Sequence, residues 1–381
     1  MNPQVSVVIP SLNEEKTIKA CIEHIREGCE KAGISYEIIV VDSSSDKTPE
    51  IAASMGARVI YPAVRGYGNA YLTGFEHASG SIVVIGDADN TYDFRIISEL
   101  IKPIQNGSAD MVIGSRMRGT ILPGAMPALH QYLGNPLLTR LVNFAFKTRF
   151  SDCHSGFRAI DARVLNTLSL HTGGMEFASE MMIEAARKNI RVEEIPITYY
   201  PRESPSNLHS FADGWRHIRF IMLMRPLPFL MIPGSIFALL GLFLMISLVL
   251  TRSVENISLH SFILGAICLT GGFQLLMMGF ALKAYAITHG FDKPGSMMVK
   301  WLKYQSLEVI LFAGCGLLIV GVCAGIWVLF EWISHEYGEL SQVTNAVFVM
   351  CSVILGLQLI FTAIIVSMMV LSGERDGYLL S

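Results

Sequence analysis

The sequence has few charged residues and no strong excess of either sign. Lys, Arg, Asp and Glu make up 16% of its 381 residues and leave a formal net charge of −3. A protein that binds nucleic acid needs a basic face, so this balance speaks against such a partner. The seven cysteines form no Cys-x-x-Cys pair. Their spacing therefore argues against a zinc site or a disulfide framework and favours free thiols in a reducing compartment.

The charged residues that are present lie mostly in the first part of the chain. Only 14 of the 61 follow Pro226. After this residue, four stretches contain no Lys, Arg, Asp or Glu at all: 227–251, 256–282, 309–330 and 340–373. About 20 apolar residues cross a bilayer as a helix, and a buried core helix would explain one such stretch but not four in succession. We therefore expect an integral membrane protein whose transmembrane domain covers 227–373. Its four helices are expected at about 227–251, 260–283, 308–330 and 344–371.

The loops between these stretches predict the orientation. Arg216, Arg219 and Arg225 precede the first span, lysines lie between the second and third, and the loop between the third and fourth carries three glutamates and no Lys or Arg. Loops rich in Lys and Arg stay on the cytosolic side, and no signal-peptide pattern precedes the first predicted strand. We expect a cytosolic domain over 1–208 and a cytosolic tail over 374–381. The membrane would be the cell membrane of a prokaryote or the endoplasmic reticulum of a eukaryote.

The segment 209–226 interleaves arginines with large apolar residues. This pattern predicts an amphipathic helix that lies in the membrane interface. A last helix of the soluble domain, packed against its sheet, would show the same pattern, and both interpretations stay open.

The first 208 residues alternate short apolar runs with helical patterns, which predicts an α/β fold with a mostly parallel sheet covered on both faces. The strands are expected at about 5–10, 37–41, 58–61, 81–85 and 111–114. In such sheets ligands bind at the carboxyl ends of the strands. Four charged residues follow such ends and mark the expected site: Asp42, Asp87, Asp89 and Arg116.

The triplet Asp87-Ala88-Asp89 directly follows a buried strand. Two carboxylates at that place need a cation or a hydrogen-bonding ligand. Mg²⁺ or Mn²⁺ takes oxygen ligands and can bridge a carboxylate to a diphosphate, which stabilises a nucleoside diphosphate as a leaving group. An Asp-x-Asp triplet alone is a weak signal, because many such triplets are solvated turns.

Further motifs in order along the chain strengthen this interpretation: Pro10-Ser11-Leu12-Asn13-Glu14-Glu15, Val41-Asp42, Gly114-Ser115-Arg116, Asp152-Cys153-His154-Ser155-Gly156-Phe157-Arg158 and Glu176-Phe177 with Glu180. Together with the Asp-Ala-Asp triplet they resemble glycosyltransferase family 2, whose domain has the Rossmann-like GT-A fold. Within that family the set is most similar to the polyprenyl-phosphate (dolichyl-phosphate) mannose and glucose synthases. Their Arg-x-Gly-x-Ser-Lys segment is similar to Arg202-Glu203-Ser204-Pro205-Ser206-Asn207 here.

The resemblance implies a role for each matching residue. Those expected to bind the donor are Pro10, Leu12, Glu14, Val41, Asp42, Asp87, Ala88, Asp89, Arg116 and Arg202. Those expected at the transfer step are Asp89, Arg116, Asp152 and Arg158, with Asp152 as a base or an orienting group. Those expected on the acceptor side are Ser155, Glu176, Asn207 and Arg216. Those expected at the metal are Asp89, Asp87 and Thr91.

Two departures from the pattern affect this assignment. Thr91 stands where the mannose synthases often have Gln, and Asn207 stands where they have a phosphate-facing Lys. Either donor handling differs or a nearby residue supplies the charge; His209 and Arg216 are candidates.

The implied reaction is inverting transfer of a hexose from UDP-glucose or GDP-mannose to a polyprenyl or dolichyl phosphate at the cytosolic face; UDP-GlcNAc stays open as a donor. A phosphate acceptor is already anionic, so it needs positioning and charge shielding more than a strong base. A processive polysaccharide synthase of the same family is the first alternative, but the Gln-x-x-Arg-Trp motif of those enzymes is missing. A non-catalytic nucleotide-sugar sensor joined to a lipid carrier or flippase is the second, and the intact Asp-Ala-Asp triplet speaks against it.

Two further patterns have structural interpretations. The loop Arg65-Gly66-Tyr67-Gly68-Asn69 could cradle a phosphate at a helix N-terminus, but a tight turn is the better interpretation because the loop lacks Gly-x-Gly-x-x-Gly. Small residues in the predicted spans favour close helix contacts within one chain or between copies in a homo-oligomer. These residues are Gly271, Gly272, Gly314, Gly316, Gly321 and Gly325.

Overall fold

The computed structural model describes residues 3–203, 210–251, 256–289, 291–292, 296–334 and 343–375. The chain divides into two units, Met1–Ile221 and Met222–Ser381, and each is described by itself. Three predictions fall outside the described residues: the role of Asn207, the candidate cation His209 and most of the tail over 374–381.

The first unit is built on one seven-stranded sheet. Its strand order is β3-β2-β1-β4-β6-β5-β7. The strands are β1 (Val5–Ser11), β2 (Tyr36–Asp42), β3 (Arg58–Ile60), β4 (Ile82–Ile85), β5 (Met111–Ile121), β6 (Arg158–Asp161) and β7 (Val192–Tyr199). All pairs are parallel except those of β6, which runs antiparallel to β4 and β5. The predicted mostly parallel sheet is confirmed. The sequence did not predict β6 or β7. In β6 only two apolar residues lie between charged ends, and β7 contains Glu193, Glu194 and Pro196, so neither strand has a continuous apolar run.

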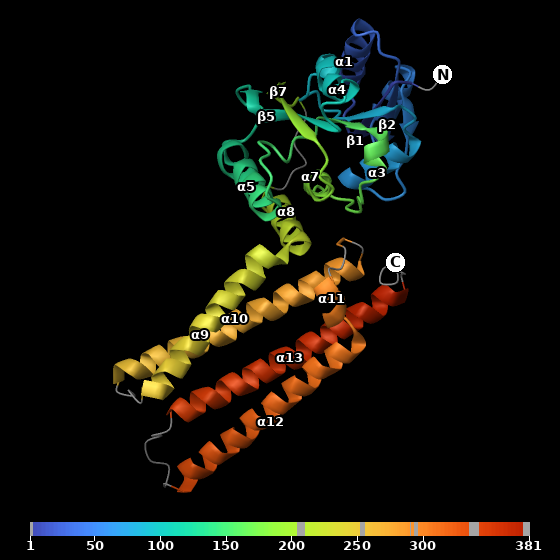
Figure 1. Cartoon of the computed structure of the whole chain (residues 1–381). Helices are drawn as coiled ribbons and strands as arrows, with labels where there is room; N and C mark the ends of the chain where they lie inside the picture. Colours follow the sequence, from blue (N-terminus) through green and yellow to red (C-terminus); the bar gives the residue numbers. More distant parts are fainter. Residues whose placement is uncertain are drawn as a thin grey trace. The chain divides into compact units, whose positions relative to one another are not determined.

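Helices cover both faces of this sheet (Figure 1). The helices of the first unit are α1 (Ile18–Lys31), α2 (Thr48–Ser54), α3 (Tyr67–His77), α4 (Ile97–Gln105), α5 (Asn135–Phe146), α6 (Ala162–Leu165), α7 (Phe177–Arg187) and α8 (Ser210–Met224), with a short 3-10 helix, η1 (Phe94–Ile96), and a short π-helix, η2 (His130–Gly134). The last three residues of α8 belong to the second unit. Val7 and Ile9 of β1 join a core cluster with residues of α1, α2 and α4. Val8, which points to the opposite face, packs against Gly74 of α3, where an added Cβ would lie 2.2 Å from Val8 Cγ1. Successive side chains of β1 are therefore buried on opposite faces, as a covered parallel sheet requires.

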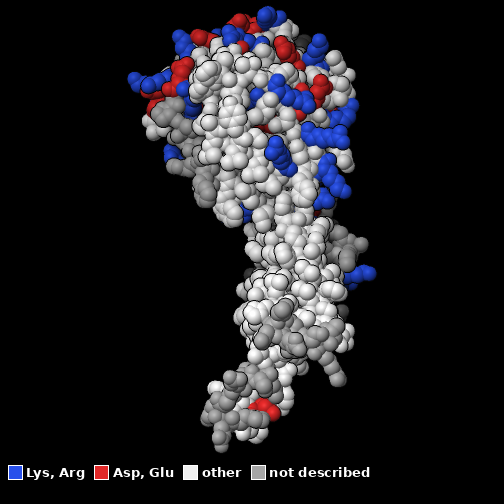
Figure 2. Space-filling view, turned by 90° about the vertical axis from the view of Figure 1, so that its left-hand side faces the viewer, with Lys and Arg blue, Asp and Glu red and all other residues white. Residues whose placement is uncertain are grey.

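The second unit consists of long apolar helices. They are η3 (Leu227–Met231), α9 (Ile232–Thr251), α10 (Asn256–Thr288), α11 (Ser296–Trp301), α12 (Tyr304–Ser334) and α13 (Val343–Arg375). Four segments are long and apolar enough to cross a membrane: Leu227–Leu250, Leu259–Thr288, Gln305–Ser334 and Val343–Ser372. Figure 2 shows Lys, Arg, Asp and Glu gathered on the first unit, with few on the visible face of the helices. The predicted fold class, an α/β domain followed by four apolar helices, is confirmed.

Glycines bring the apolar helices into backbone contact. An added Cβ at Gly272 of α10 would lie 2.3 Å from the backbone nitrogen of Ala238 in α9, and one at Gly241 of α9 would lie 2.4 Å from the carbonyl oxygen of Gly265. Among the glycines named from the sequence, Gly272, Gly314, Gly321 and Gly325 lie at helix contacts, whereas an added Cβ at Gly271 or Gly316 would meet nothing within 4 Å.

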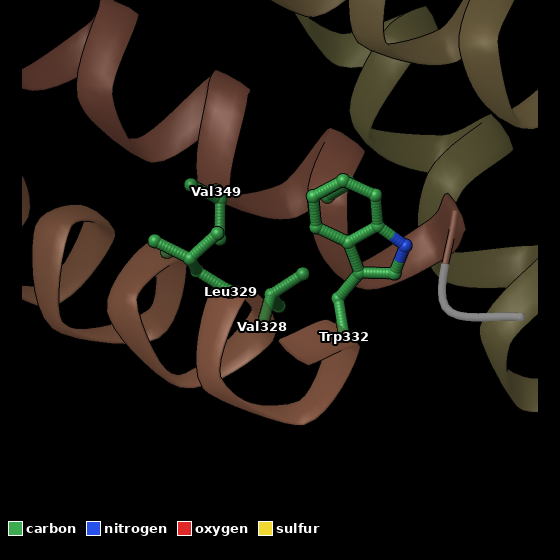
Figure 3. A pocket seen from close by; sticks show the side chains of 6 residues that line it. Val328, Leu329, Trp332 and Val349 are labelled. Atoms are coloured by element: carbon green, nitrogen blue, oxygen red, sulfur yellow. The ribbon is translucent and has the colours of Figure 1, made fainter. Parts of the chain in front are cut away.

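A groove between α12 and α13 is lined by Val328, Leu329, Trp332 and Val349, together with two small residues (Figure 3). Its lining contains no charged side chain. It is suited to apolar chains and does not suit a nucleotide.

Candidate active site

The ends of β1 and β2 carry the first part of the predicted site. Asp42 ends β2 and is buried, and its carboxylate accepts hydrogen bonds from Ser11 Oγ at 2.7 Å and from Ser44 Oγ at 2.6 Å. Ser11 ends β1, so neighbouring strand ends hold each other. Pro10 and Leu12 flank Ser11, and 41% of the Leu12 side chain is exposed although it is apolar. An exposed leucine beside a fixed carboxylate suits a flat heterocycle that also offers hydrogen-bond donors.

The two carboxylates of the Asp-Ala-Asp triplet are held in different ways. Asp87 Oδ1 accepts hydrogen bonds from Tyr67 at 3.0 Å and Tyr71 at 3.4 Å. Asp89 Oδ1 accepts from the Thr91 backbone at 3.1 Å and from the Thr91 hydroxyl at 2.6 Å. Burial, and then the charge of Asp89, raise the pKa of Asp87 to about 7 against the lowering effect of the Tyr67 hydroxyl. The ionised form of Asp87 is therefore disfavoured while Asp89 is charged and no cation is bound, and a cation between the two carboxylates would stabilise it.

Arg202, which follows β7, contacts acidic groups from two strand ends. Its Nη2 forms an ion pair with Glu14 Oε1, and its Nε lies 3.5 Å from Asp89 Oδ2. Glu14 is buried after β1, and its Oε2 also accepts a hydrogen bond from Thr17 at 3.1 Å. Residues predicted for the nucleoside, the diphosphate and the metal thus meet at one guanidinium group.

Arg116 and Asp152 form a buried two-point ion pair. Arg116 Nε lies 2.7 Å from Asp152 Oδ2, and Arg116 Nη2 donates to Oδ1 at 2.9 Å. The Arg116 guanidinium also lies over the ring of Tyr199, 5.2 Å from its centroid. Burial alone would raise the pKa of Asp152, but Arg116 holds it below its usual range. Asp152 is therefore an ionised partner of Arg116, a geometry that favours the orienting role over the role of a base.

The loop between α5 and β6 is fixed by Arg158 and Ser155. Arg158 is buried, and its guanidinium donates to the carbonyl groups of Ser155, Cys153 and Ala178 at 2.8 to 3.0 Å. Burial lowers the pKa of Arg158, and the three groups that accept its hydrogen bonds are backbone carbonyls. Ser155 Oγ donates to the Gly114 carbonyl at 2.5 Å. Both residues thus shape the loop beside Asp152, and their contacts lie with the protein rather than with an open surface.

Of the predicted acceptor-side residues, Ser155 lies in the loop of Asp152, whereas Glu176 and Arg216 belong to the start of α7 and to α8. Glu176 precedes α7, and its Oε2 is buried without a hydrogen-bond partner among the described residues. Arg216 is exposed on α8. Nearby, the amides of Gly68 and Asn69 both donate to the Gly173 carbonyl, at 3.0 and 3.2 Å. The start of α3 is therefore capped from within the protein, as the tight-turn interpretation predicts, and its first amides do not face a phosphate.

Sequence reasoning missed several tyrosines of the site. Tyr67 and Tyr71 bind Asp87, and Tyr92 accepts the Gly156 amide at 2.9 Å. The first two lie four residues apart on α3, so they share one helix face. That spacing was the available signal, but only the fold brings the face to the end of β4.

A divalent ion fits these residues on one condition. Asp87 and Asp89 supply hard oxygen ligands, but no group of three or more His, Cys, Asp or Glu side chains is arranged for a metal in the part of the chain that the structure describes. An ion would thus need oxygen atoms from a diphosphate as well. The donor set suits Mg²⁺ or Mn²⁺ bound together with a nucleotide.

Comparisons with known proteins show the family of the chain. The family model "Glycosyl transferase family 2" matches residues 6–169, and "Glycosyltransferase family 2 C-terminal transmembrane region" matches residues 281–370. The low-salt glycan biosynthesis hexosyltransferase Agl6 of Haloferax volcanii is 40% identical over 366 residues, which cover 94% of this chain and 87% of that protein. A dolichyl-phosphate hexose transferase of the same organism is 33% identical over 55% of this chain and 89% of its own length.

A solved structure is similar as well. Glucosyl-3-phosphoglycerate synthase from Mycobacterium tuberculosis, in complex with Mn²⁺, UDP and glucosyl-3-phosphoglycerate, is 22% identical with a TM-score of 0.48. The match covers 58% of this chain and 79% of that one.

The fold is that of a glycosyltransferase with a GT-A domain followed by apolar membrane helices. The chain belongs to glycosyltransferase family 2 and is a hexosyltransferase and an integral membrane protein. The resemblance seen in its motifs is confirmed.

Proposed function

We propose that this enzyme transfers a hexose from a nucleotide sugar to the phosphate of a polyprenyl or dolichyl phosphate, with inversion at the sugar carbon. The observation that carries the proposal is the meeting of Asp87, Asp89 and Arg202 at the carboxyl ends of the parallel strands. Acceptor specificity is supported by the dolichyl-phosphate hexose transferase that is 33% identical.

The donor would lie along the strand ends. Pro10, Leu12, Glu14, Val41 and Asp42 would hold the nucleoside, with the two carboxylates accepting hydrogen bonds from base or ribose. The diphosphate would lie at Asp87, Ala88 and Asp89. UDP-glucose and GDP-mannose are the donors we propose to test first.

Mg²⁺ or Mn²⁺ would be held by Asp89 and Asp87, with Thr91 fixing Asp89. When bound, such an ion supplies charge neutralisation for the departing nucleoside diphosphate. Arg202 adds a guanidinium group, which matches phosphate oxygens in pairs.

The acceptor phosphate would be shielded by Arg116, which Asp152 orients. Ser155 and Arg158 keep the loop of Asp152 in place, and Glu176, Asn207 and Arg216 would lie on the path of the lipid headgroup. Because the acceptor is already anionic, placing it in line with the sugar carbon is the main catalytic task.

The surface formed by η2 and α5 of the first unit supports the proposal that this unit acts at the bilayer surface. Large apolar side chains are exposed on η2, α5 and the residue before them: Leu129, Tyr132, Leu133, Leu137 and Phe144. The segment 122–151 has no Asp or Glu, and it carries Arg140, Lys147 and Arg149. Such a face suits anionic lipid headgroups.

We therefore propose a domain over 1–208 on the cytosolic side, an interfacial helix over 209–226, transmembrane helices within 227–373, and both termini in the cytosol. Association of copies through the exposed glycines of the spans is a further element of this proposal.

The test is transfer by the full chain in nanodiscs. Radiolabelled UDP-glucose, GDP-mannose and UDP-GlcNAc are each supplied with a polyprenyl phosphate, and the lipid fraction is extracted. We expect one donor to yield a lipid carrying a single hexose, and Asp89→Asn to abolish it. Asp161→Asn serves as the control, because Asp161 lies opposite Ile82 at the start of β4, at the other end of the strand from the Asp-Ala-Asp triplet, and its carboxylate contacts Arg163. A growing polymer, or full activity of Asp89→Asn, would refute the proposal.

A further inference from the structure

Two histidines from distant parts of the first unit share one serine hydroxyl. His154 belongs to the loop of Asp152, Ser179 lies on α7, and His217 lies on α8. Ser179 Oγ is 3.1 Å from His154 Nε2 and 2.7 Å from His217 Nδ1. Ser179 and His217 are buried, and the two imidazole rings meet edge to face with centroids 4.7 Å apart.

The hydrogen-bonded series His217–Ser179–His154 leads to the buried Arg116–Asp152 ion pair of the candidate active site. The His154 amide donates to Asp152 Oδ1 at 3.3 Å, the same oxygen that accepts from Arg116. The first turn of α7 is tied to the same loop, because Arg158 donates to both Cys153 and Ala178. A displacement of α8 at His217 would thus be transmitted to Asp152. It would pass through the hydrogen bonds of Ser179 with His217 and His154 and then through the backbone between His154 and Asp152.

The donor and acceptor roles of His154, Ser179 and His217 can be assigned from burial. His154 Nδ1 is buried and has no hydrogen-bond partner among the described residues. A buried N–H without an acceptor is rarer than a bare acceptor atom, so the proton of neutral His154 belongs on Nε2. His154 then donates to Ser179, and Ser179 donates to the lone pair of His217 Nδ1. This arrangement requires that His217 is neutral at Nδ1.

We propose that His217, through Ser179 and His154, is a positioning residue of the transfer reaction, which seats α8 on the Asp152 loop only while both imidazoles are neutral. This proposal rests on the proposed function, because the positioned group is the Arg116–Asp152 pair. A proton on His217 Nδ1 would turn the Ser179 hydroxyl toward His154. His154 would then have to carry its proton on the buried Nδ1, at the cost of an unsatisfied donor.

The charges around the chain oppose further protonation of His154. Burial, followed by the effect of His217, holds the pKa of His154 well below the usual range; Asp152 acts in the opposite direction, and Arg116 and Arg158 act with the burial. Inside the loop, these effects favour the neutral form of His154.

Three variants of the full chain in nanodiscs test the proposal. His217→Asn keeps an acceptor near Nδ1 but does not titrate, His217→Leu removes the acceptor, and Ser179→Ala removes the shared hydroxyl. His77→Asn, on α3, is the matched control. Amide hydrogen exchange of α8 peptides, corrected for intrinsic rates, and hexose transfer are both measured between pH 5.5 and 8.

At pH 8 we expect wild type and His217→Asn to be alike, and His217→Leu and Ser179→Ala to lose about tenfold or more in kcat with little change in KM for the donor. Between pH 8 and 5.5, α8 of wild type should lose protection about fivefold or more relative to His217→Asn. The transfer rate of wild type divided by that of His217→Asn should fall over the same pH range. Titration of Asp87 affects both proteins alike, so it cancels in this ratio.

Equal protection and a constant rate ratio across the pH range would overturn the proposal, as would wild-type kcat in both His217→Leu and Ser179→Ala. Exchange is measured without substrates. Failure of the wild type to glycosylate any polyprenyl phosphate would thus refute the proposed function and leave the exchange result to decide the seating of α8.

Discussion

Removal of the negative charge from the buried Arg116–Asp152 pair gives the sharpest test of the active-site geometry. In Asp152→Asn the side chain keeps its shape, but Arg116 loses its counter-ion in a place where both groups are almost fully buried. Breaking a buried ion pair on one side costs about 3 to 5 kcal/mol, because the remaining charge is left uncompensated. For a unit of this size, each kcal/mol lowers the melting temperature by about 2 to 4 °C. We expect the melting temperature of Asp152→Asn to fall by about 6 to 20 °C.

The double-mutant cycle separates the ion pair from simple packing. Arg116→Met leaves the Asp152 carboxylate buried and should be about as destabilising as Asp152→Asn. The double variant has neither charge, so its loss should be smaller than the sum of the single losses by at least about 2 kcal/mol. Melting is followed by circular dichroism of the full chain in detergent, with all variants at one scan rate.

The pH dependence of this difference has a definite sign. The folded pKa of Asp152 lies below its unfolded value, so the stability that it contributes is present above about pH 4 and is lost as the pH falls through the folded pKa. The melting temperature of wild type should exceed that of Asp152→Asn by the same number of degrees from pH 5 to 8. A melting temperature of Asp152→Asn within about 1 °C of wild type, or additive single losses, would refute the reasoning.

Other predictions concern the metal, the membrane helices and the buried arginine. Burial and the charge of Asp89 raise the pKa of Asp87 to about 7, so the Asp87 carboxyl of the folded protein is protonated below that pH. Mn²⁺-dependent donor binding should therefore release about one proton at pH 6 and almost none at pH 8.5. Calorimetry in buffers of different ionisation enthalpy measures the release, and equal values at both pH values would contradict the assignment. Gly272→Leu should disrupt the α9–α10 contact and yield aggregated protein on size exclusion, because its Cβ meets the α9 backbone at 2.3 Å, whereas Gly271→Leu meets nothing within 4 Å and should behave as wild type. Arg158→Met should lower the melting temperature more than Arg158→Lys, since it leaves three buried carbonyl groups without this donor, each at a cost of about 1 to 3 kcal/mol; equal melting temperatures of the two variants would show that these hydrogen bonds contribute little.

Local patterns predicted five of the seven strands, because short apolar runs reflect burial directly. They did not predict β6 or β7, and they ended β5 too early, since this strand runs to Ile121 and Arg116 lies within it. They predicted that Asp42 and Asp89 would share one edge, and the register of β1 with β2 and β4 brings their strand ends together. The contact between Glu14 and Arg202 spans 188 residues. No local signal encodes such a pair, since it depends on how β7 and β1 are placed in the finished sheet.

The charge inventory of the site gives a reason for a metal that is independent of any resemblance. Eight buried or partly buried carboxylate and guanidinium side chains surround the strand ends: Glu14, Asp42, Asp87, Asp89, Asp152, Arg116, Arg158 and Arg202. Five carboxylates and three guanidinium groups leave two negative charges, or one while Asp87 keeps its proton. A nucleoside diphosphate sugar and a lipid phosphate would together add about three negative charges or more in a site of low dielectric constant, where unbalanced charge is expensive. Arg116 is already balanced by Asp152, and Arg202 by Glu14 and Asp89, so these arginines cannot neutralise both substrates alone. A divalent cation bound together with the donor would restore the balance. Held by Asp89, it would also take the place of Arg202 as the partner of that carboxylate and leave the guanidinium available to phosphate.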